Sequence, residues 1–229
     1  MKVAVIPARG GSKRIPRKNI REFCGMPMIA HSILSAQKSM IFDKIIVSTD
    51  DEEIADVVRA YGVEVPFLRP RELSDDFTGT VPVISHAVKW IEDNVQKVTA
   101  ACCIYATAPF ITSEDLIKGL QELIVHKSDY AFSVTHYPFP IQRAIKVNSQ
   151  GRTEMFFPEH YNTRSQDLEE ALHDAGQFYW GTSQAWLNQR PIFSSSSVPV
   201  ILPRTRVQDI DTQEDWDRAE QLFYLLNRG

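Results

Sequence analysis

Val3-Ala-Val-Ile-Pro-Ala-Arg-Gly-Gly-Ser-Lys-Arg-Ile-Pro-Arg-Lys-Asn19 is a short apolar run that breaks abruptly into a glycine-containing, cationic loop. The run from Val3 to Ile6 has the composition of a buried strand. Gly10 and Gly11 allow a backbone to approach a ligand and to turn its N–H groups inward. Five cations, which would neutralise phosphate oxygens, follow within ten residues: Arg9, Lys13, Arg14, Arg17 and Lys18. The loop is predicted to hold a polyphosphate, and the alternative is a solvated basic turn without a ligand.

This loop lacks both of the common phosphate-binding patterns. The Walker A sequence G-x-x-x-x-G-K-[ST] and the dinucleotide fingerprint G-x-G-x-x-G are absent from it. Its place directly after an apolar strand nevertheless matches the ligand-binding edge of an open α/β sheet.

Composition restricts the class of protein. A chain of 229 residues with 43% hydrophobic residues can bury the core of one large α/β domain. The net charge of −4 argues against a nucleic-acid partner. Cys102 and Cys103 are adjacent in an apolar run and indicate core thiols in a reducing compartment, whereas Cys24 stands alone, and the three have no metal-binding spacing. No apolar stretch reaches the length of a membrane span or a signal peptide, so a soluble, cytoplasmic protein without a membrane partner is expected.

Short apolar runs alternate with helical patterns along the chain, which predicts an α/β fold with a Rossmann-like, mainly parallel sheet of about seven strands. Residues 100–105 are continuously apolar and should be central in that sheet. Residues 63–68 form another expected strand, and Thr80 is placed to cap a helix. The pattern changes at 136–174, where residues 144–147 and 153–157 flank a turn and predict an antiparallel hairpin. We therefore expect one domain over 1–229, with 136–174 as an insertion.

Asp209 and Asp211 form a second candidate site between the strand at 198–202 and the last helix. Residues two apart on an extended segment point to the same side, so both carboxylates can reach one cation. Mg²⁺ is commonly held by one or two carboxylates together with substrate phosphates. The alternative is that Asp211 caps the last helix and that Asp209 is solvated.

The loop resembles the N-terminal signature of sugar-activating cytidylyltransferases, specifically the CMP-sialic acid synthetase family. The family pattern is roughly [IV]-P-A-R-x-x-S-K-x-x-x-x-K-N, which Ile6 to Asn19 fits. Further similar segments are Ser48-Thr-Asp50, Arg69-Pro-x-x-Leu73, Ala106-Thr-Ala-Pro109 and Gln208-Asp-Ile-Asp-Thr212. Asn162-Thr-Arg-Ser-Gln-Asp167 and His173-Asp-Ala-Gly-Gln-Phe-Tyr-Trp180 look most like the pseudaminic acid cytidylyltransferases within that family.

The resemblance implies a nucleotidyltransferase-type fold with a dimerisation insertion, and it implies roles for named residues. The implied nucleotide contacts are Arg9, Gly10, Gly11, Ser12, Lys13, Lys18, Asn19, Arg71, Thr80 and Thr107. Arg9 and Lys18 would stabilise charge at the α-phosphate and on leaving pyrophosphate, whereas Arg14 and Arg17 are expected to be solvated. Thr80 could equally serve only as a helix cap.

The implied sugar contacts are Tyr105, Arg164, Gln177, Phe178 and Tyr179. Neighbours on a strand face opposite ways, so either Phe178 or Tyr179 should be a core aromatic. Arg164 could hold a sugar carboxylate or be a solvated surface arginine. Residues 105–109 lack the acidic residue of the related 3-deoxy-manno-octulosonate enzymes, and Tyr105 replaces the glutamine typical of sialic acid enzymes. The first departure disfavours the octulosonate branch and a second metal site formed by an aspartate in this segment, and the second indicates a different acceptor-sugar pocket.

The resulting hypothesis is a homodimeric, Mg²⁺-dependent enzyme that transfers CMP from CTP to a nine-carbon α-keto acid sugar, with pseudaminic acid favoured. Arg9, Lys18, Asp209 and Asp211 would be its catalytic residues, the two aspartates as metal ligands. The alternatives are a CMP-sialic or CMP-legionaminic acid synthetase, and a non-catalytic module that senses CTP or a CMP-sugar.

Overall fold

The computed structural model describes residues 1–227, and its centre is a six-stranded sheet with the order β10-β6-β9-β5-β1-β4. The strands are β1 (Lys2–Pro7), β4 (Lys44–Ser48), β5 (Ala100–Ile104), β6 (Tyr130–His136), β9 (Leu172–Thr182) and β10 (Ser197–Ile201). Only β9 runs antiparallel to its neighbours, β5 and β6. The α/β fold with a mainly parallel sheet is therefore confirmed.

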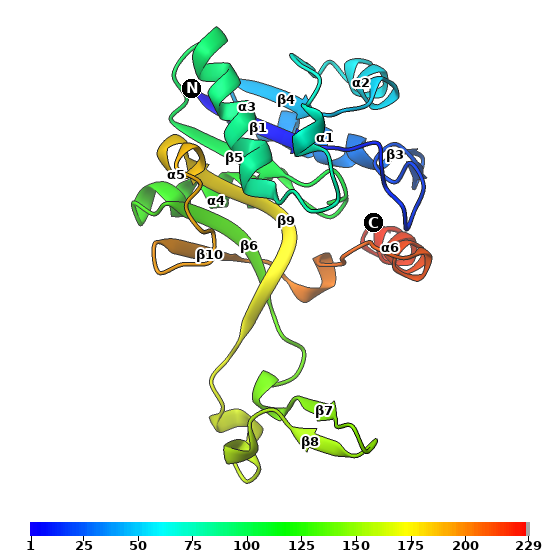
Figure 1. The fold of residues 1–229 in the computed structure, drawn as a ribbon, viewed down its shortest axis with the longest axis vertical. Coiled ribbons are helices and arrows are strands. Elements are labelled where there is room, and N and C mark those ends of the chain that lie inside the picture. The colour runs from blue at the N-terminus through cyan, green and yellow to red at the C-terminus, as the bar shows by residue number, and fades with distance from the viewer. Residues whose placement is uncertain (228–229) are drawn as a thin grey trace.

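Helices cover both faces of this sheet (Figure 1). Ala4 and Ile6 of β1 join a core cluster with α1 (Met28–Ser39), α2 (Glu52–Arg59) and α4 (Ser113–Val125). Val3 and Val5 face the opposite cluster with α3 (Thr80–Asn94) and α5 (Ser183–Leu187). Burial on both faces explains why these strands are continuously apolar. Cys102 and Cys103 are buried free thiols on β5, as the sequence indicated.

A third cluster fixes the C-terminal helix α6 (Gln213–Leu226) beside the N-terminal loop. Trp216 of α6 packs edge-on against Phe23 at 5.3 Å, and Phe23 lies in the small hairpin of β2 (Glu22–Phe23) and β3 (Met26–Pro27). The guanidinium of Arg21 lies 4.5 Å from the centre of the Trp216 ring. These contacts bring the beginning and the end of the chain together.

Two local predictions differ from the structure. Residues 63–68 make only isolated bridges to the β4 edge, Ile46 to Glu64 and Thr49 to Leu68, instead of a continuous strand. Thr80 is the first helical residue of α3, and Gly79 occupies the cap position without a side-chain bond. The expectation that Thr80 caps the helix was therefore wrong.

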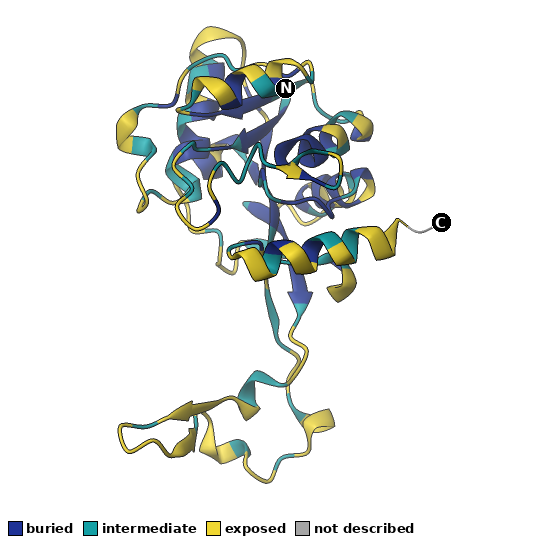
Figure 2. Cartoon of the chain, turned by 90° about the vertical axis from the view of Figure 1, so that its right-hand side faces the viewer, coloured by how far each residue is buried: buried dark blue, intermediate teal, exposed yellow. Residues whose placement is uncertain are grey.

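Residues 136–174 leave the body as an insertion that projects below the sheet (Figure 1). It contains the expected hairpin of β7 (Ile145–Val147) and β8 (Thr153–Met155) and three 3₁₀ turns, η2 (Ile141–Arg143), η3 (Pro158–His160) and η4 (Ser165–Asp167). Most of its surface is exposed (Figure 2). None of its residues from 137 to 171 is buried.

No helix within residues 1–227 is long and apolar enough to cross a membrane.

Candidate active site

A cleft of about 480 Å³ opens where β1 and β5 end. Its walls come from the loop after β1, the segment after β5, the first turn of α3 and residues 69–80. The predicted site residues that line it are Arg9, Ser12, Lys13, Lys18, Asn19, Thr80, Tyr105 and Thr107. This is the carboxyl edge of parallel strands, where open α/β sheets bind ligands.

Asp50 and Asp51, which follow β4, contact the loop after β1 and hold it in place. The Gly10 N–H donates to Oδ1 of Asp50 at 3.0 Å. A Cβ added to Gly10 would lie 2.3 Å from Oδ2 of Asp51, so only glycine fits at this position. A Cβ on Gly11 would meet no atom within 4 Å, so the close approach explains Gly10 but not Gly11.

Arg17 is a structural cation, which corrects the expectation that it is solvated. It has a left-handed backbone with φ of 57°. Its Nη1 and Nη2 donate to the two carboxylate oxygens of Asp51 at 2.6 and 2.8 Å, and Nη2 also contacts Glu53. This bidentate bond lowers the pKa of Asp51 to about 2. Asp51 also accepts from the Ile54 N–H as the N-cap of α2, so the cationic loop is bound to that helix.

Arg9 and Lys13, at the mouth of the cleft, share one carboxylate. Nη1 of Arg9 donates to Asp76 at 2.7 Å and to the Asp75 carbonyl at 2.8 Å. Nζ of Lys13 donates to the other oxygen of Asp76 at 2.5 Å. Nδ2 of Asn19 holds the Arg9 carbonyl at 3.0 Å, which fixes the loop beneath Arg9. The carboxylate of Asp76 thus occupies the position that an anionic ligand bound by Arg9 and Lys13 would take.

Lys18 connects the cleft with the aspartate pair. Its Nζ donates to the Ile210 carbonyl at 2.6 Å and lies 3.3 Å from Oδ1 of Asp211. Nη2 of Arg14 lies 2.8 Å from the same oxygen, so Arg14 also has a protein partner instead of being only solvated. Asp209 and Asp211 do not line the cleft themselves, but both of these cations do.

The alternative in which Asp211 caps α6 does not hold. Thr212 is the N-cap and forms a capping box with Asp215, whose carboxylate accepts from the Thr212 N–H at 2.8 Å. The carboxylate of Asp211 is therefore not used as the cap and contacts Lys18 and Arg14 instead. Burial and then the charge of Asp211 raise the pKa of Asp209, whereas the charge of Lys18 lowers it.

The donor set around Asp209 and Asp211 fits a hard cation that takes its remaining ligands from substrate. Within residues 1–227, no group of three or more His, Cys, Asp or Glu side chains is arranged to hold a metal ion. Two carboxylates alone match a Mg²⁺-type site that is completed by phosphate oxygens and water. The role of this pair as metal ligands stays a prediction.

The predicted sugar contacts separate into different environments. Phe178 is fully buried in the core beside α4, so a sugar contact by its side chain does not fit the structure. Tyr179 is 3% exposed and lies behind Tyr105, with the two ring centroids 5.3 Å apart. Both aromatics are thus buried, although only one was expected to be. Nε2 of Gln177 donates to the Arg206 carbonyl at 2.5 Å.

Arg164 lies in the projecting insertion, where it pairs with Asp167 at 2.7 Å. It does not line the cleft of its own chain.

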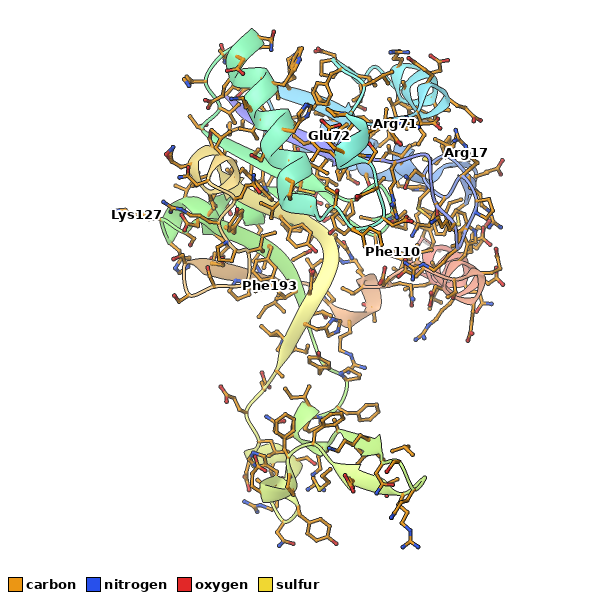
Figure 3. All side chains as sticks on the ribbon, viewed as in Figure 1. Arg17, Arg71, Glu72, Phe110, Lys127 and Phe193 are labelled. Carbon is orange, nitrogen blue, oxygen red and sulfur yellow. The ribbon has the colours of Figure 1, made fainter. Side chains whose placement is uncertain are left out.

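Arg71 was predicted to lie near the base and ribose, but of Arg69 and Arg71 it is Arg69 that lines the cleft. Arg71 is exposed on η1 (Arg71–Leu73) (Figure 3). The Arg69 side chain is only 4% exposed, and its Nη2 lies 3.8 Å from Asp50. Its Nε and Nη2 have no hydrogen-bond partner within the described residues. The sequence did contain a signal for this, because Arg69 directly follows the apolar residues 65–68, and an arginine in that position is a candidate for a buried cation.

The fold and this cleft define a nucleotidyltransferase-type α/β protein, and comparison of the sequence gives the family. The chain matches the Cytidylyltransferase family over residues 3–225 and belongs to it. It is an enzyme of that class.

Among its relatives, a pseudaminic acid cytidylyltransferase of Campylobacter jejuni is 45% identical over 96% of this chain and 95% of that protein. A CMP-N,N'-diacetyllegionaminic acid synthase of Legionella pneumophila is 31% identical over 97% and 96%. A CMP:2-keto-3-deoxy-manno-octonic acid synthetase complexed with CTP has the same fold, with a TM-score of 0.72, 18% identity and coverage of 98% of this chain and 99% of that one. Cytidylyltransferases of this fold generally use a divalent metal ion.

Proposed function

We propose that this enzyme transfers CMP from CTP to pseudaminic acid, with release of pyrophosphate. The observation that carries the proposal is the joining of the cationic loop to the Asp209–Asp211 pair through Lys18. The 45% identity to a pseudaminic acid cytidylyltransferase supports this acceptor over legionaminic acid, whose synthase is 31% identical.

In the proposed reaction the anomeric hydroxyl of the sugar attacks the α-phosphorus. A bond forms between the anomeric oxygen and phosphorus, the bond from phosphorus to the α,β-bridging oxygen breaks, and the hydroxyl proton is lost to solvent. Such a transfer needs mainly positioning and neutralisation of charge. Arg9 and Lys13 would bind the β- and γ-phosphates in place of Asp76, and Lys18 would stabilise charge that develops near the α-phosphate.

Arg69 is suited to the cytidine end of the substrate. Its unpaired Nε and Nη2 can donate to a carbonyl oxygen and a ring nitrogen, which is what the acceptor edge of cytosine offers. Burial lowers the pKa of Arg69 relative to an exposed arginine, so an acceptor on these atoms would relieve the cost of holding its charge.

We propose that the metal ion is Mg²⁺ and that Asp209 and Asp211 are its protein ligands. The two carboxylates would hold the ion, and its chemistry when bound would be Lewis-acid stabilisation of negative charge on phosphate and on the attacking hydroxyl. Asp209 and Asp211 would be brought to the phosphates by the Lys18 contact with Ile210 and Asp211.

We further propose that residues 136–174 form the interface of a homodimer. The insertion exposes large apolar side chains that a monomer would leave in water: Phe139 is 78% exposed, Val147 71% and Tyr161 72%. Sedimentation analysis of the wild type and of Val147→Lys tests this. A wild type that sediments as a monomer at assay concentration would contradict it. The cytoplasmic location also stays a prediction, which the free thiols support.

The decisive experiment is pyrophosphate release from CTP with a panel of nonulosonic acids. Pseudaminic acid should give the highest kcat/KM. A preference for sialic or legionaminic acid would show that this other sugar is the acceptor. CTP binding without release of pyrophosphate with any acceptor would favour a non-catalytic module that senses CTP or a CMP-sugar.

A further inference from the structure

The chain reaches the aspartate pair through a short 3₁₀ turn, η5 (Arg204–Arg206), which follows β10. Arg206 ends this turn three residues before Asp209. Its side chain is only 23% exposed, and it does not line the cleft. Any effect of Arg206 on the reaction would therefore be exerted through other residues.

The guanidinium of Arg206 is bound by three oxygen atoms from two segments of the chain. Nη1 and Nη2 donate to the two carboxylate oxygens of Asp115, with the Nη2 bond at 2.9 Å. Nη1 also donates to the Phe110 carbonyl at 3.2 Å. Asp115 is itself fixed, because it accepts the Thr112 N–H at 3.0 Å in the capping box of α4. A bidentate bond to a carboxylate that is 10% exposed holds Arg206 in one orientation.

A further bond holds the backbone of the turn. Nε2 of Gln177 on β9 donates to the Arg206 carbonyl at 2.5 Å, and Gln177 is only 3% exposed. Both the side chain and the main chain of Arg206 are thus bound to buried parts of the domain.

The other end of the aspartate segment is fixed separately. Ile210 is buried in the third core cluster together with Phe110. Its carbonyl oxygen accepts the hydrogen bond from Lys18. Asp209 therefore lies between two anchored residues, Arg206 and Ile210.

Phe110 also relates these anchors to the cleft. It follows the segment after β5 in which Tyr105 and Thr107 line the cleft. Asp209 and Asp211 do not line the cleft themselves. Their distance from a bound nucleotide therefore depends on how residues 206–211 are held.

We propose that Arg206 is a positioning residue that, held by Asp115, keeps Asp209 and Asp211 at the distance from the cleft at which they bind a metal ion together with CTP. The inference rests on the proposed function, because the two aspartates are metal ligands only in that proposal. Arg206 itself touches neither the ion nor a substrate.

Binding of CTP without an acceptor sugar, measured by calorimetry with Mg²⁺ and with EDTA, tests this without turnover. Arg206→Met removes every donor of the side chain, while Asp115 keeps its bonds from Thr112. The Kd for CTP with Mg²⁺ should rise about tenfold, as for the loss of a group that orients metal ligands. The Kd with EDTA should be unchanged. Arg204→Met, which replaces an exposed arginine of the same turn, is the matched control and should leave both Kd values alone.

Asp115→Asn breaks the same pair from the side of α4. The Thr112 N–H requires the amide oxygen, so the NH₂ group would face Arg206 and the bidentate bond would be lost. The Kd for CTP with Mg²⁺ should again rise, by about 3- to 10-fold, with the Kd in EDTA unchanged. If Arg206→Met does not fold, Asp115→Asn decides alone.

Equal rises in the two Kd values would show a merely structural role and would overturn the inference, as would an unchanged Kd with Mg²⁺ in a folded variant. A wild type that binds CTP equally well with Mg²⁺ and with EDTA would instead overturn the metal site of the proposed function. The two failures are therefore distinguishable.

Discussion

Nζ of Lys18 lies 2.6 Å from the carbonyl oxygen of Ile210, a residue 192 positions later in the chain. The same ammonium group lies 3.3 Å from the Asp211 carboxylate, and it is largely buried, with 17% of the side chain exposed. The cationic loop after β1 and the Asp209–Asp211 segment are therefore joined through the side chain of Lys18. The packing of α6 against the hairpin at Phe23 holds this contact in place.

Lys18→Met should lower kcat by roughly 10²- to 10³-fold, because it removes both the charge near the α-phosphate and the link to the aspartate pair. Arg14→Met is the matched control, since Arg14 contacts the same oxygen of Asp211 from a side chain that is 67% exposed. The control should lose less than about tenfold, in line with the small worth of exposed ion pairs. Steady-state kinetics of both variants with saturating CTP measure the difference. Near-normal turnover of Lys18→Met would remove Lys18 from the reaction.

Asp76→Asn should tighten CTP binding. The carboxylate of Asp76 neutralises Arg9 and Lys13, the cations predicted to bind phosphate, so a ligand has to displace it. These ion pairs are exposed to solvent and therefore weak, so only a two- to fivefold decrease in Kd for CTP is expected by calorimetry. Glu72→Gln removes a charge from the same segment without touching these cations and should leave Kd alone. Weaker CTP binding by Asp76→Asn would show that Asp76 belongs to the nucleotide complex.

Gly10→Ala and Gly11→Ala should behave differently although the two glycines are adjacent. A methyl group at position 10 would overlap Oδ2 of Asp51, whereas one at position 11 meets open space. We expect Gly10→Ala to cost about 1–3 kcal/mol of stability, as for other overpacked sites, and to weaken CTP binding as the loop shifts. Gly11→Ala should change the melting temperature little. Equal melting temperatures for the two variants would contradict the close approach.

The alternating pattern predicted the layers of the fold because both faces of β1 and β5 are covered, which requires continuous apolar runs. The reversed direction of β9 could not be read from it. The insertion leaves at the carboxyl end of β6 and returns beside it at Leu172, so β9 has to run back antiparallel.

The sequence predicted which residues line the cleft where their spacing along the chain determines it, and not where side-chain packing does. Arg9 and Lys18 follow from the loop that must come after β1. The choice between Arg69 and Arg71 depends on which side of the chain faces the cleft at the edge of β4, where only isolated bridges fix the backbone. Thr80 lies over Tyr105 instead of capping its helix, and this depends on the distance between α3 and β5.

Asp209→Asn tests the metal assignment against a merely solvated aspartate. The substitution keeps size and hydrogen bonding but removes the negative charge that would hold the ion. Turnover should fall about 10²-fold or more, and the Mg²⁺ concentration for half-maximal activity should rise. Thermal stability should be kept, because repulsion from Asp211 is relieved. Asp217→Asn, in the first turns of α6, is the control and should retain normal turnover. Normal turnover with an unshifted Mg²⁺ dependence in Asp209→Asn would leave the assignment unsupported.

Asp51→Asn isolates the ion pair that holds the cationic loop to α2. Asparagine is also a good N-cap, so the bond to the Ile54 N–H is kept and mainly the Arg17 pair is lost. The pKa of Asp51 is lowered to about 2 in the folded protein, chiefly by the hydrogen bond from Arg17, so the pair stabilises the fold fully above the unfolded-state pKa near 3.8. That contribution is lost as the pH falls from about 4 through 2.

Because the Arg17 side chain is 36% exposed, solvent screening reduces the expected stabilisation to about 1 kcal/mol at pH 7. Urea unfolding of the wild type and of Asp51→Asn at pH 7 should differ by that amount, and the difference should shrink at pH 3. Glu53→Gln removes the other partner of Arg17, whose side chain is 69% exposed, and should have a smaller effect at both pH values. A difference between wild type and Asp51→Asn that stays constant from pH 7 to pH 3 would show that Asp51 stabilises the loop by its shape and hydrogen bonds and not by its charge.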